Sequence, residues 1–290
     1  MIGSCWMIAA MAGFAVEDSF IKFSSSLLPI GQVLLLFGLG GGLVFATGAI
    51  MNGDQLFTRQ AVSPTMRVRM LFEIVARLFF VLALALTPLS SASAILQATP
   101  IVVVAGAALL FGEQVGWRRW FAICVGFVGV LIIIRPSADG FTILSLLAVI
   151  GMFGFAGRDL ASRAAPLALS TFVLGFYGFI AIMIAGALYS VWSGEALVWP
   201  NSTALLASTG AVAFGVFAYI SLMKAMRTGE VSAVTPFRYT RLLFGIGLGV
   251  LWFGEKIEIS MIVGSSLIVV SGLFIMARND SKKHQVNPTL

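Results

Sequence analysis

The sequence predicts an all-helical membrane protein, with about ten transmembrane helices arranged as two inverted five-helix repeats. Three observations support this fold class. Of the 290 residues, 59% are apolar and only 10% are charged, whereas soluble domains carry about 25% charged residues. The apolar residues form stretches of about 20, the length of a helix that crosses a bilayer. Two sequence patterns also recur about half a chain length apart.

Helix-length apolar stretches follow one another along the chain with short hydrophilic connections between them. A membrane-spanning β-barrel would instead show short strands of alternating polarity. The connections leave no room for a separate soluble domain. The expected spans are Ser4–Phe23, Gln32–Met51, Met66–Thr87, Ser90–Gly112, Trp117–Ile134, Phe141–Arg158, Ser170–Trp192, Thr203–Lys224, Ser232–Gly254 and Ile259–Met276.

The first stretch has two interpretations, because a secretory signal peptide also contains an apolar segment near the N-terminus. This chain lacks the basic residues that begin such a peptide, and Glu17 and Asp18 interrupt a plausible cleavage region. We therefore interpret the stretch as the first span.

Positive charge predicts the orientation, because connections on the cytoplasmic side are enriched in Lys and Arg. With the N-terminus inside, three basic residues fall outside: Lys22, Arg135 and Lys256. Twelve fall inside: Arg59, Arg67, Arg69, Arg118, Arg119, Arg158, Arg163, Lys224, Arg227, Arg278, Lys282 and Lys283. Both termini are therefore expected in the cytoplasm of a bacterial cell, with the chain in its inner membrane. Topology accounts for part of the net charge of +6, so we expect no nucleic-acid partner.

The chain repeats itself internally. Residues 11–18 resemble residues 152–159 at an offset of 141, and residues 109–113 resemble residues 251–255 at an offset of 142. An odd number of spans separates the copies, so the second copy has the opposite orientation in the membrane. We expect repeats at 1–136 and 140–278, followed by a polar cytoplasmic tail at 279–290. Inverted repeats are typical of secondary transporters; a duplicated scaffold without transport is the alternative.

At these residues the chain resembles the EamA type of the drug/metabolite transporter superfamily, over nearly its whole length. The resemblance rests on the Gly-Glu pairs that close the fourth and ninth spans, and on the small-residue runs 90–94 and 231–234. It implies five plus five helices around a central cavity. It also implies substrates such as amino acids, nucleosides, cofactors or drugs, with riboflavin or S-adenosylmethionine importers and amino-acid exporters among the relatives. Residues 231–241 are more polar than the usual ninth span of that family.

The third span contains a charged pair. Arg77 lies about eleven residues into it, close to mid-depth at ~16 Å, and Glu73 lies one turn earlier on the same face. Ionisable groups inside a membrane usually face an interior cavity. The pair is either a structural ion pair or an anchor for a substrate carboxylate or phosphate, with Glu73 as the counter-ion of Arg77.

The ninth span contains a second polar group of candidate substrate-binding residues. Arg238 and Arg241 share one helix face, with Tyr239 beside them, and Pro236 weakens the backbone hydrogen bonds there. The alternative is that the arginines extend to the cytoplasmic surface. Arginines favour an anionic or zwitterionic substrate.

The repeat relates further residues to these positions. Gln97 matches Tyr239 and Thr99 matches Arg241, each at an offset of 142. By the same offset Tyr219 matches Arg77, so all three become candidate substrate-binding residues.

Glu17-Asp18 and Arg158-Asp159 form a symmetric pair of dipeptides. They are either helix-end groups that reach water, or gating or proton-coupling residues. The two Gly-Glu pairs have a structural explanation, because Gly112 and Gly254 suit the left-handed conformation that ends a helix and the following Glu suits the start of the next helix.

The sequence predicts a secondary transporter that moves a small polar metabolite by alternating access, with import or export, coupling ion and homo-oligomerisation left open. A non-transporting sensor or scaffold and a drug efflux protein are the alternatives. An enzyme is not expected, because the spans contain no histidine and the chain no nucleotide-binding loop. Cys5, Cys124 and His284 form no metal motif, and no cofactor is expected.

Overall fold

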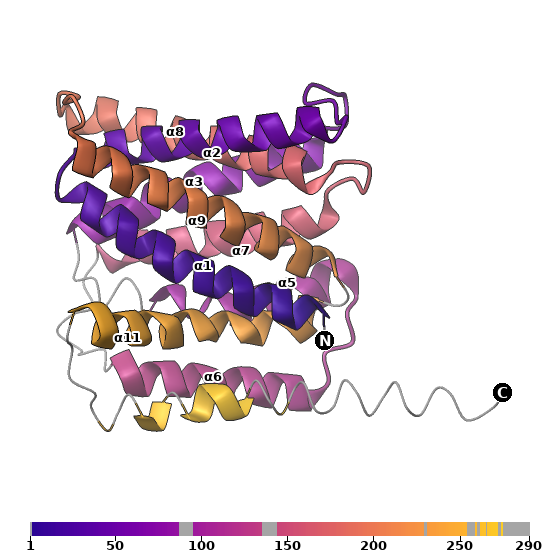
Figure 1. Ribbon diagram of the computed structural model, residues 1–290. Helices are drawn as coiled ribbons and strands as arrows, with labels where there is room; N and C mark the ends of the chain where they lie inside the picture. The colour runs from indigo at the N-terminus through magenta and orange to yellow at the C-terminus, as the bar shows by residue number, and fades with distance from the viewer. Residues whose placement is uncertain are drawn as a thin grey trace.

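The computed structural model describes residues 2–86, 95–134, 144–228 and 231–253, together with residues 259, 262–264, 266–271 and 274 near the C-terminus. Every regular element of its described part is a helix (Figure 1). The first repeat contributes α1 (Ile2–Ser25), α2 (Ile30–Met51), α3 (Pro64–Leu86), α5 (Thr99–Phe111) and α6 (Trp117–Ile134). The second contributes α7 (Ser145–Ala164), α8 (Thr171–Ser193), α9 (Ser202–Arg227), α10 (Val231–Val234), the 3₁₀ helix η2 (Thr235–Tyr239) and α11 (Thr240–Phe253).

The all-helical membrane fold is confirmed. Within the described residues, α1, α2, α8 and α9 are long and apolar enough to cross a membrane. The expected run Ser90–Ala94, the outer basic residues Arg135 and Lys256, Gly254-Glu255 and the tail 279–290 lie outside the described residues.

The helix pairs follow the symmetry of the sequence repeat. α2 packs against α8, α1 against α9 and α3 against α7, with α1 also against α11 and α5 against α7. Since α1 matches α7, α3 matches α9 and α5 matches α11 at an offset of 141 to 142, each contact has its symmetry mate. In Figure 1, α2 and α8 lie together at one edge, and α11 and α6 at the opposite edge.

Contacts between the connections show that the repeats are inverted. The side-chain amide of Gln32, at the start of α2, accepts a hydrogen bond from the amide of Val198 and donates one to the Val198 carbonyl, at 2.9 Å and 2.6 Å. The end of α1 therefore lies at the same end of the bundle as the end of α8. Because α7 leads into the opposite end of α8, α1 and α7 run in opposite directions.

Two spans differ from the sequence prediction. α7 continues to Ala164, six residues beyond the expected end at Arg158, because Arg158 and Asp159 are buried against other helices instead of ending the span. The ninth span is broken into α10, η2 and α11, in line with the weakened hydrogen bonding expected at Pro236.

Gly112 ends α5 with φ of 63°, which confirms its expected left-handed conformation. The following Glu113 has a partner that the sequence did not predict. Its carboxylate accepts the backbone N–H of Val231 at 2.9 Å, so it stabilises the start of α10 in the other repeat.

Candidate functional site

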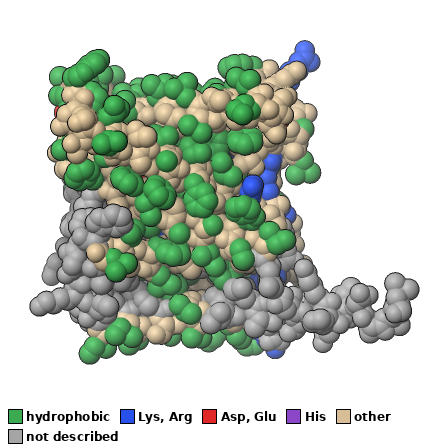
Figure 2. All heavy atoms as spheres, in the orientation of Figure 1, with side chains coloured by type: hydrophobic (Ala, Val, Ile, Leu, Met, Phe, Trp, Pro, Cys, Tyr) green, Lys and Arg blue, Asp and Glu red, His purple; other side chains and the backbone are tan. Residues whose placement is uncertain are grey.

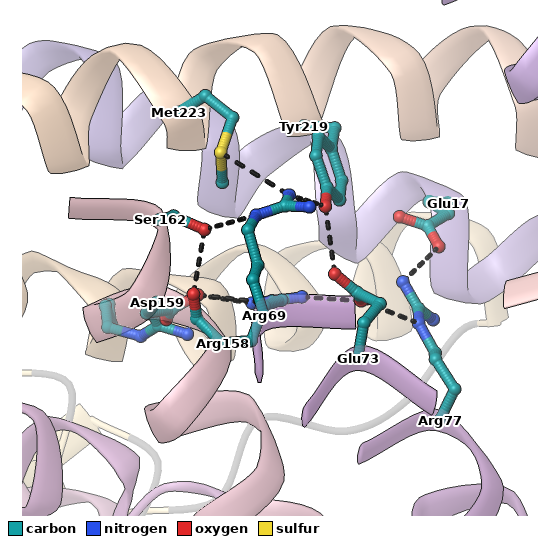
Figure 3. Close-up of polar contacts among 10 residues, drawn as sticks. Glu17, Arg69, Glu73, Arg77, Arg158, Asp159, Ser162, Tyr219 and Met223 are labelled. Atoms are coloured by element: carbon teal, nitrogen blue, oxygen red, sulfur yellow. Dashed lines mark hydrogen bonds and ion pairs between the residues drawn. The ribbon is translucent and has the colours of Figure 1, made fainter. Parts of the chain in front are cut away.

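Charged side chains from both repeats meet in the interior of the bundle (Figure 3). We call this group the central charge network. Its members are Glu17 and Asp18 from α1, Arg69, Glu73 and Arg77 from α3, Arg158 and Asp159 from α7, Tyr219 from α9, Arg238 from η2 and Arg241 from α11. Five arginines face four carboxylates, which leaves one positive charge in excess.

Glu73 is the centre of the network and is fully buried. Its Oε1 lies 3.2 Å from the Arg158 guanidinium and 3.9 Å from that of Arg77. Its Oε2 accepts a hydrogen bond from the Tyr219 hydroxyl at 2.9 Å. The predicted Glu73–Arg77 pair is therefore present, and Glu73 also joins α3 to α7 and α9.

Arg77 lies between two carboxylates and two aromatic rings. Its guanidinium is 3.8 Å from Glu17 and faces the rings of Phe37 and Phe155 at 5.8 Å and 5.7 Å. Ring faces attract cations within about 6 Å. Glu17 is 1% exposed, and neither of its oxygens accepts a hydrogen bond from the described residues.

Asp159 holds two arginines. One oxygen accepts from Arg158 at 2.7 Å and 2.8 Å, and the other pairs with Arg238. Its symmetry mate Asp18 pairs with Arg241, whose Nε donates at 3.0 Å. Both matched aspartates thus bind arginines of the one segment 238–241. Glu17, Arg158 and Asp159 are buried, and Asp18 is exposed.

Arg69 is a member of the network that the sequence reasoning missed. The distribution of positive charge places it, together with Arg158, among the residues of the cytoplasmic stretches. Both side chains lie inside the bundle, however: Arg69 is fully buried and Arg158 is 3% exposed. Arg69 donates to Ser162 at 2.8 Å and to the Tyr219 hydroxyl. The four-residue spacing of Arg69, Glu73 and Arg77 on one helix face was the signal available in the sequence.

Three predicted residues lie apart from the network. Tyr239 is fully buried and its hydroxyl donates to the Ile123 carbonyl of α6 at 3.3 Å. Thr99 donates to the carbonyl of Leu96 in its own segment. Gln97 lies in the turn before α5, without a hydrogen bond to the network among the described residues.

The described residues include no cluster of side chains that could bind a metal ion. The arginines of the network can bind carboxylate or phosphate oxygens, and its carboxylates can bind ammonium groups. Charge of this kind is unfavourable inside a bilayer unless it faces partners or a water-filled cavity. The geometry therefore suits recognition of a polar solute.

Comparison with known proteins finds relatives that are named as transporters. The chain is 27% identical to a riboflavin transporter of Vibrio cholerae, over 94% of this chain and 92% of the relative. It is 22% identical to an S-adenosylmethionine uptake transporter of Rickettsia prowazekii, over 98% and 96%. It is 26% identical to a pseudopaline exporter of Pseudomonas aeruginosa, over 91% and 93%.

A solved crystal structure shares the fold, with a TM-score of 0.81 and 20% identity over 96% of this chain and 98% of that chain. The model of the EamA-like transporter family matches residues 1–135 and again residues 142–277. Family and relatives place the chain among small-molecule transporters of the bacterial inner membrane and not among enzymes. The chain belongs to the EamA-like transporter family.

Proposed function

We propose that the chain is a secondary transporter that moves a small polar metabolite bearing an anionic group across the cytoplasmic membrane by alternating access. The central charge network carries this proposal, because helices of both repeats contribute to it. When inverted repeats rock against each other, a site between them becomes accessible from each side in turn. Arg77, Glu73, Arg238, Arg241 and Tyr219 are the proposed substrate-binding residues.

The proposed orientation places both termini and the tail 279–290 in the cytoplasm, with repeats at 1–136 and 140–278. Basic side chains at one end of the bundle support it. The connections 52–63, 112–116 and 165–170 lie at the same end as the N-terminus, where Gly3 lies next to Thr228 and Arg227 bonds the carbonyls of Pro166 and Leu169. Figure 2 shows Lys and Arg side chains gathered along this side.

Reconstitution tests the proposal. Purified protein in liposomes is given radiolabelled metabolites, including riboflavin and S-adenosylmethionine because relatives carry these names. We expect flux of at least one anionic or zwitterionic metabolite, reduced by Arg77→Gln. Binding without flux would identify a non-transporting sensor, and flux of hydrophobic cations alone would identify a drug efflux protein.

Glu17 and Asp159 are the proposed coupling or gating residues. If Glu17 binds a proton during the cycle, an imposed pH gradient accelerates flux in the wild type but not in Glu17→Gln. Equal flux with and without the gradient in the wild type would show that the carrier is not proton-coupled.

A further inference from the structure

The Asp18–Arg241 pair differs from the rest of the central charge network in its exposure. Its side chains are 47% and 29% exposed, whereas every other side chain in an ion pair of the network is at most 12% exposed. Both residues lie within spans: Asp18 precedes the end of α1 by seven residues, and Arg241 follows α10 and η2. Helical side chains tilt toward the N-terminus, so the Asp18 carboxylate lies deeper than its Cα.

Exposed charge at this depth indicates contact with water. A charged side chain that faces lipid is strongly disfavoured, and charged groups inside spans normally face a bundle interior or a water-filled cavity. Asp18 and Arg241 therefore mark the part of the network that a solute reaches.

Each residue of the pair has hydrogen-bonding groups that no described residue uses. Nε and Nη2 of Arg241 both bond the same oxygen, Oδ2 of Asp18, whereas a two-pronged carboxylate contact uses both oxygens. Nη1 of Arg241 and Oδ1 of Asp18 make no hydrogen bond to the described residues. The Phe14 ring lies 5.2 Å from the guanidinium and supports it from one side.

By comparison, the symmetry-related Asp159 already uses both of its carboxylate oxygens. Both oxygens of Asp159 are engaged, one by Arg158 and one by Arg238, and Asp159 is fully buried. Of the two matched positions, only that of Asp18 has a carboxylate oxygen without a partner among the described residues, beside an arginine.

We propose that Asp18 and Arg241 together bind a zwitterionic, amino-acid-type group, with its carboxylate on Arg241 and its ammonium on Asp18. A ligand with only a carboxylate would draw Arg241 away and leave Asp18 unpaired, and one with only an ammonium would do the converse. A zwitterion pairs with both charges. Because it carries no net charge, the charge balance with neighbouring Glu17 and Arg77 stays unchanged. This inference rests on the proposed transport function and names the substrate class.

Matched ligands test the site directly. Purified protein is screened by thermal shift and then by calorimetry against the twenty protein amino acids, their decarboxylated amines and their deaminated acids. We expect at least one amino acid to bind, and its two single-charge analogues to bind at least about tenfold more weakly. Failure of all twenty amino acids to bind the wild-type protein would overturn the proposal.

Variants assign the two charges. Asp18→Asn is expected to abolish the advantage of the amino acid over its deaminated acid, and Arg241→Gln its advantage over the amine. Exposed residues supply the controls Glu195→Gln and Arg118→Gln, which make the same charge changes outside the network. Arg241→Lys keeps the charge and should retain part of the affinity. It tests the role of the charge even if the Arg241→Gln protein does not fold. Unchanged preferences in folded Asp18 and Arg241 variants would also overturn the proposal.

Flux separates this inference from the proposed function. Charge-dependent binding with no transport of the bound amino acid would uphold the site and reject the transporter. Transport of a metabolite that ignores Asp18 and Arg241 would uphold the transporter and reject the site.

Discussion

Glu73 shows how a single residue holds three helices of this protein together. Its carboxylate receives Arg158 of α7 and the hydroxyl of Tyr219 on α9, and it lies one turn from Arg77 on its own helix. Buried ion pairs contribute little net stability when complete, but loss of one partner leaves an uncompensated charge. The residue is therefore sensitive to loss of charge as well as loss of volume.

We predict that Glu73→Gln strongly lowers the thermal midpoint in detergent, because it leaves Arg158 and Arg77 short of a counter-charge; removal of one partner of a buried pair costs roughly 3–5 kcal/mol. Tyr219→Phe removes hydrogen bonds to charged groups and should cost less, roughly 1.5–3 kcal/mol for one such bond. Tyr189→Phe is the control, because that hydroxyl bonds no described residue. A Glu73→Gln protein as stable as the control would contradict the prediction.

At the scale of elements, α2 and α8 pack through glycines. A Cβ added to Gly38 would lie 2.7 Å from the backbone nitrogen of Met183, whereas one added to Gly42 would meet only the Phe179 Cβ at 3.9 Å. Two helices of matched sequence position thus approach closely near the middle of their lengths, as small residues permit in membranes.

Gly38→Ala is expected to destabilise the protein by about 1–3 kcal/mol, because the backbone of α8 has to move away. Gly42→Ala should be neutral or stabilising, since alanine favours a helix over glycine by about 1 kcal/mol. Denaturation in mixed micelles measures both. Equal effects would show that the α2–α8 contact does not limit the packing.

Most elements were predictable from local sequence, and the network was not. Trp117–Ile134 has the expected bounds because apolar length determines a span. Arg158 was placed at a span end because isolated charge is expected near water, although its partners Glu73 and Asp159 make burial acceptable. Those partners come from packing between helices distant in sequence, which one chain without its contacts does not reveal. The fully buried position of Arg69 has the same origin.

At the scale of the whole molecule, basic residues at one end fix the expected orientation in the membrane. We predict that a cysteine in place of Glu195 is labelled in intact cells by a membrane-impermeant maleimide, in a chain whose Cys5 and Cys124, both exposed, are replaced by alanine. A cysteine in place of Arg118 should react only after the membrane is opened, because cytoplasmic connections carry the Arg and Lys residues. The reverse labelling pattern would place both termini outside.

The joint attachment of Asp18 and Asp159 to residues 238–241 has a consequence for protein engineering. The two aspartates belong to different halves, yet their arginine partners are encoded by four adjacent codons. A library randomised at only those codons would vary the ionic contacts of both halves at once while the duplicated backbone stays intact. Selection for growth on a chosen nutrient from such a library would retarget the carrier with a search small enough to sample completely.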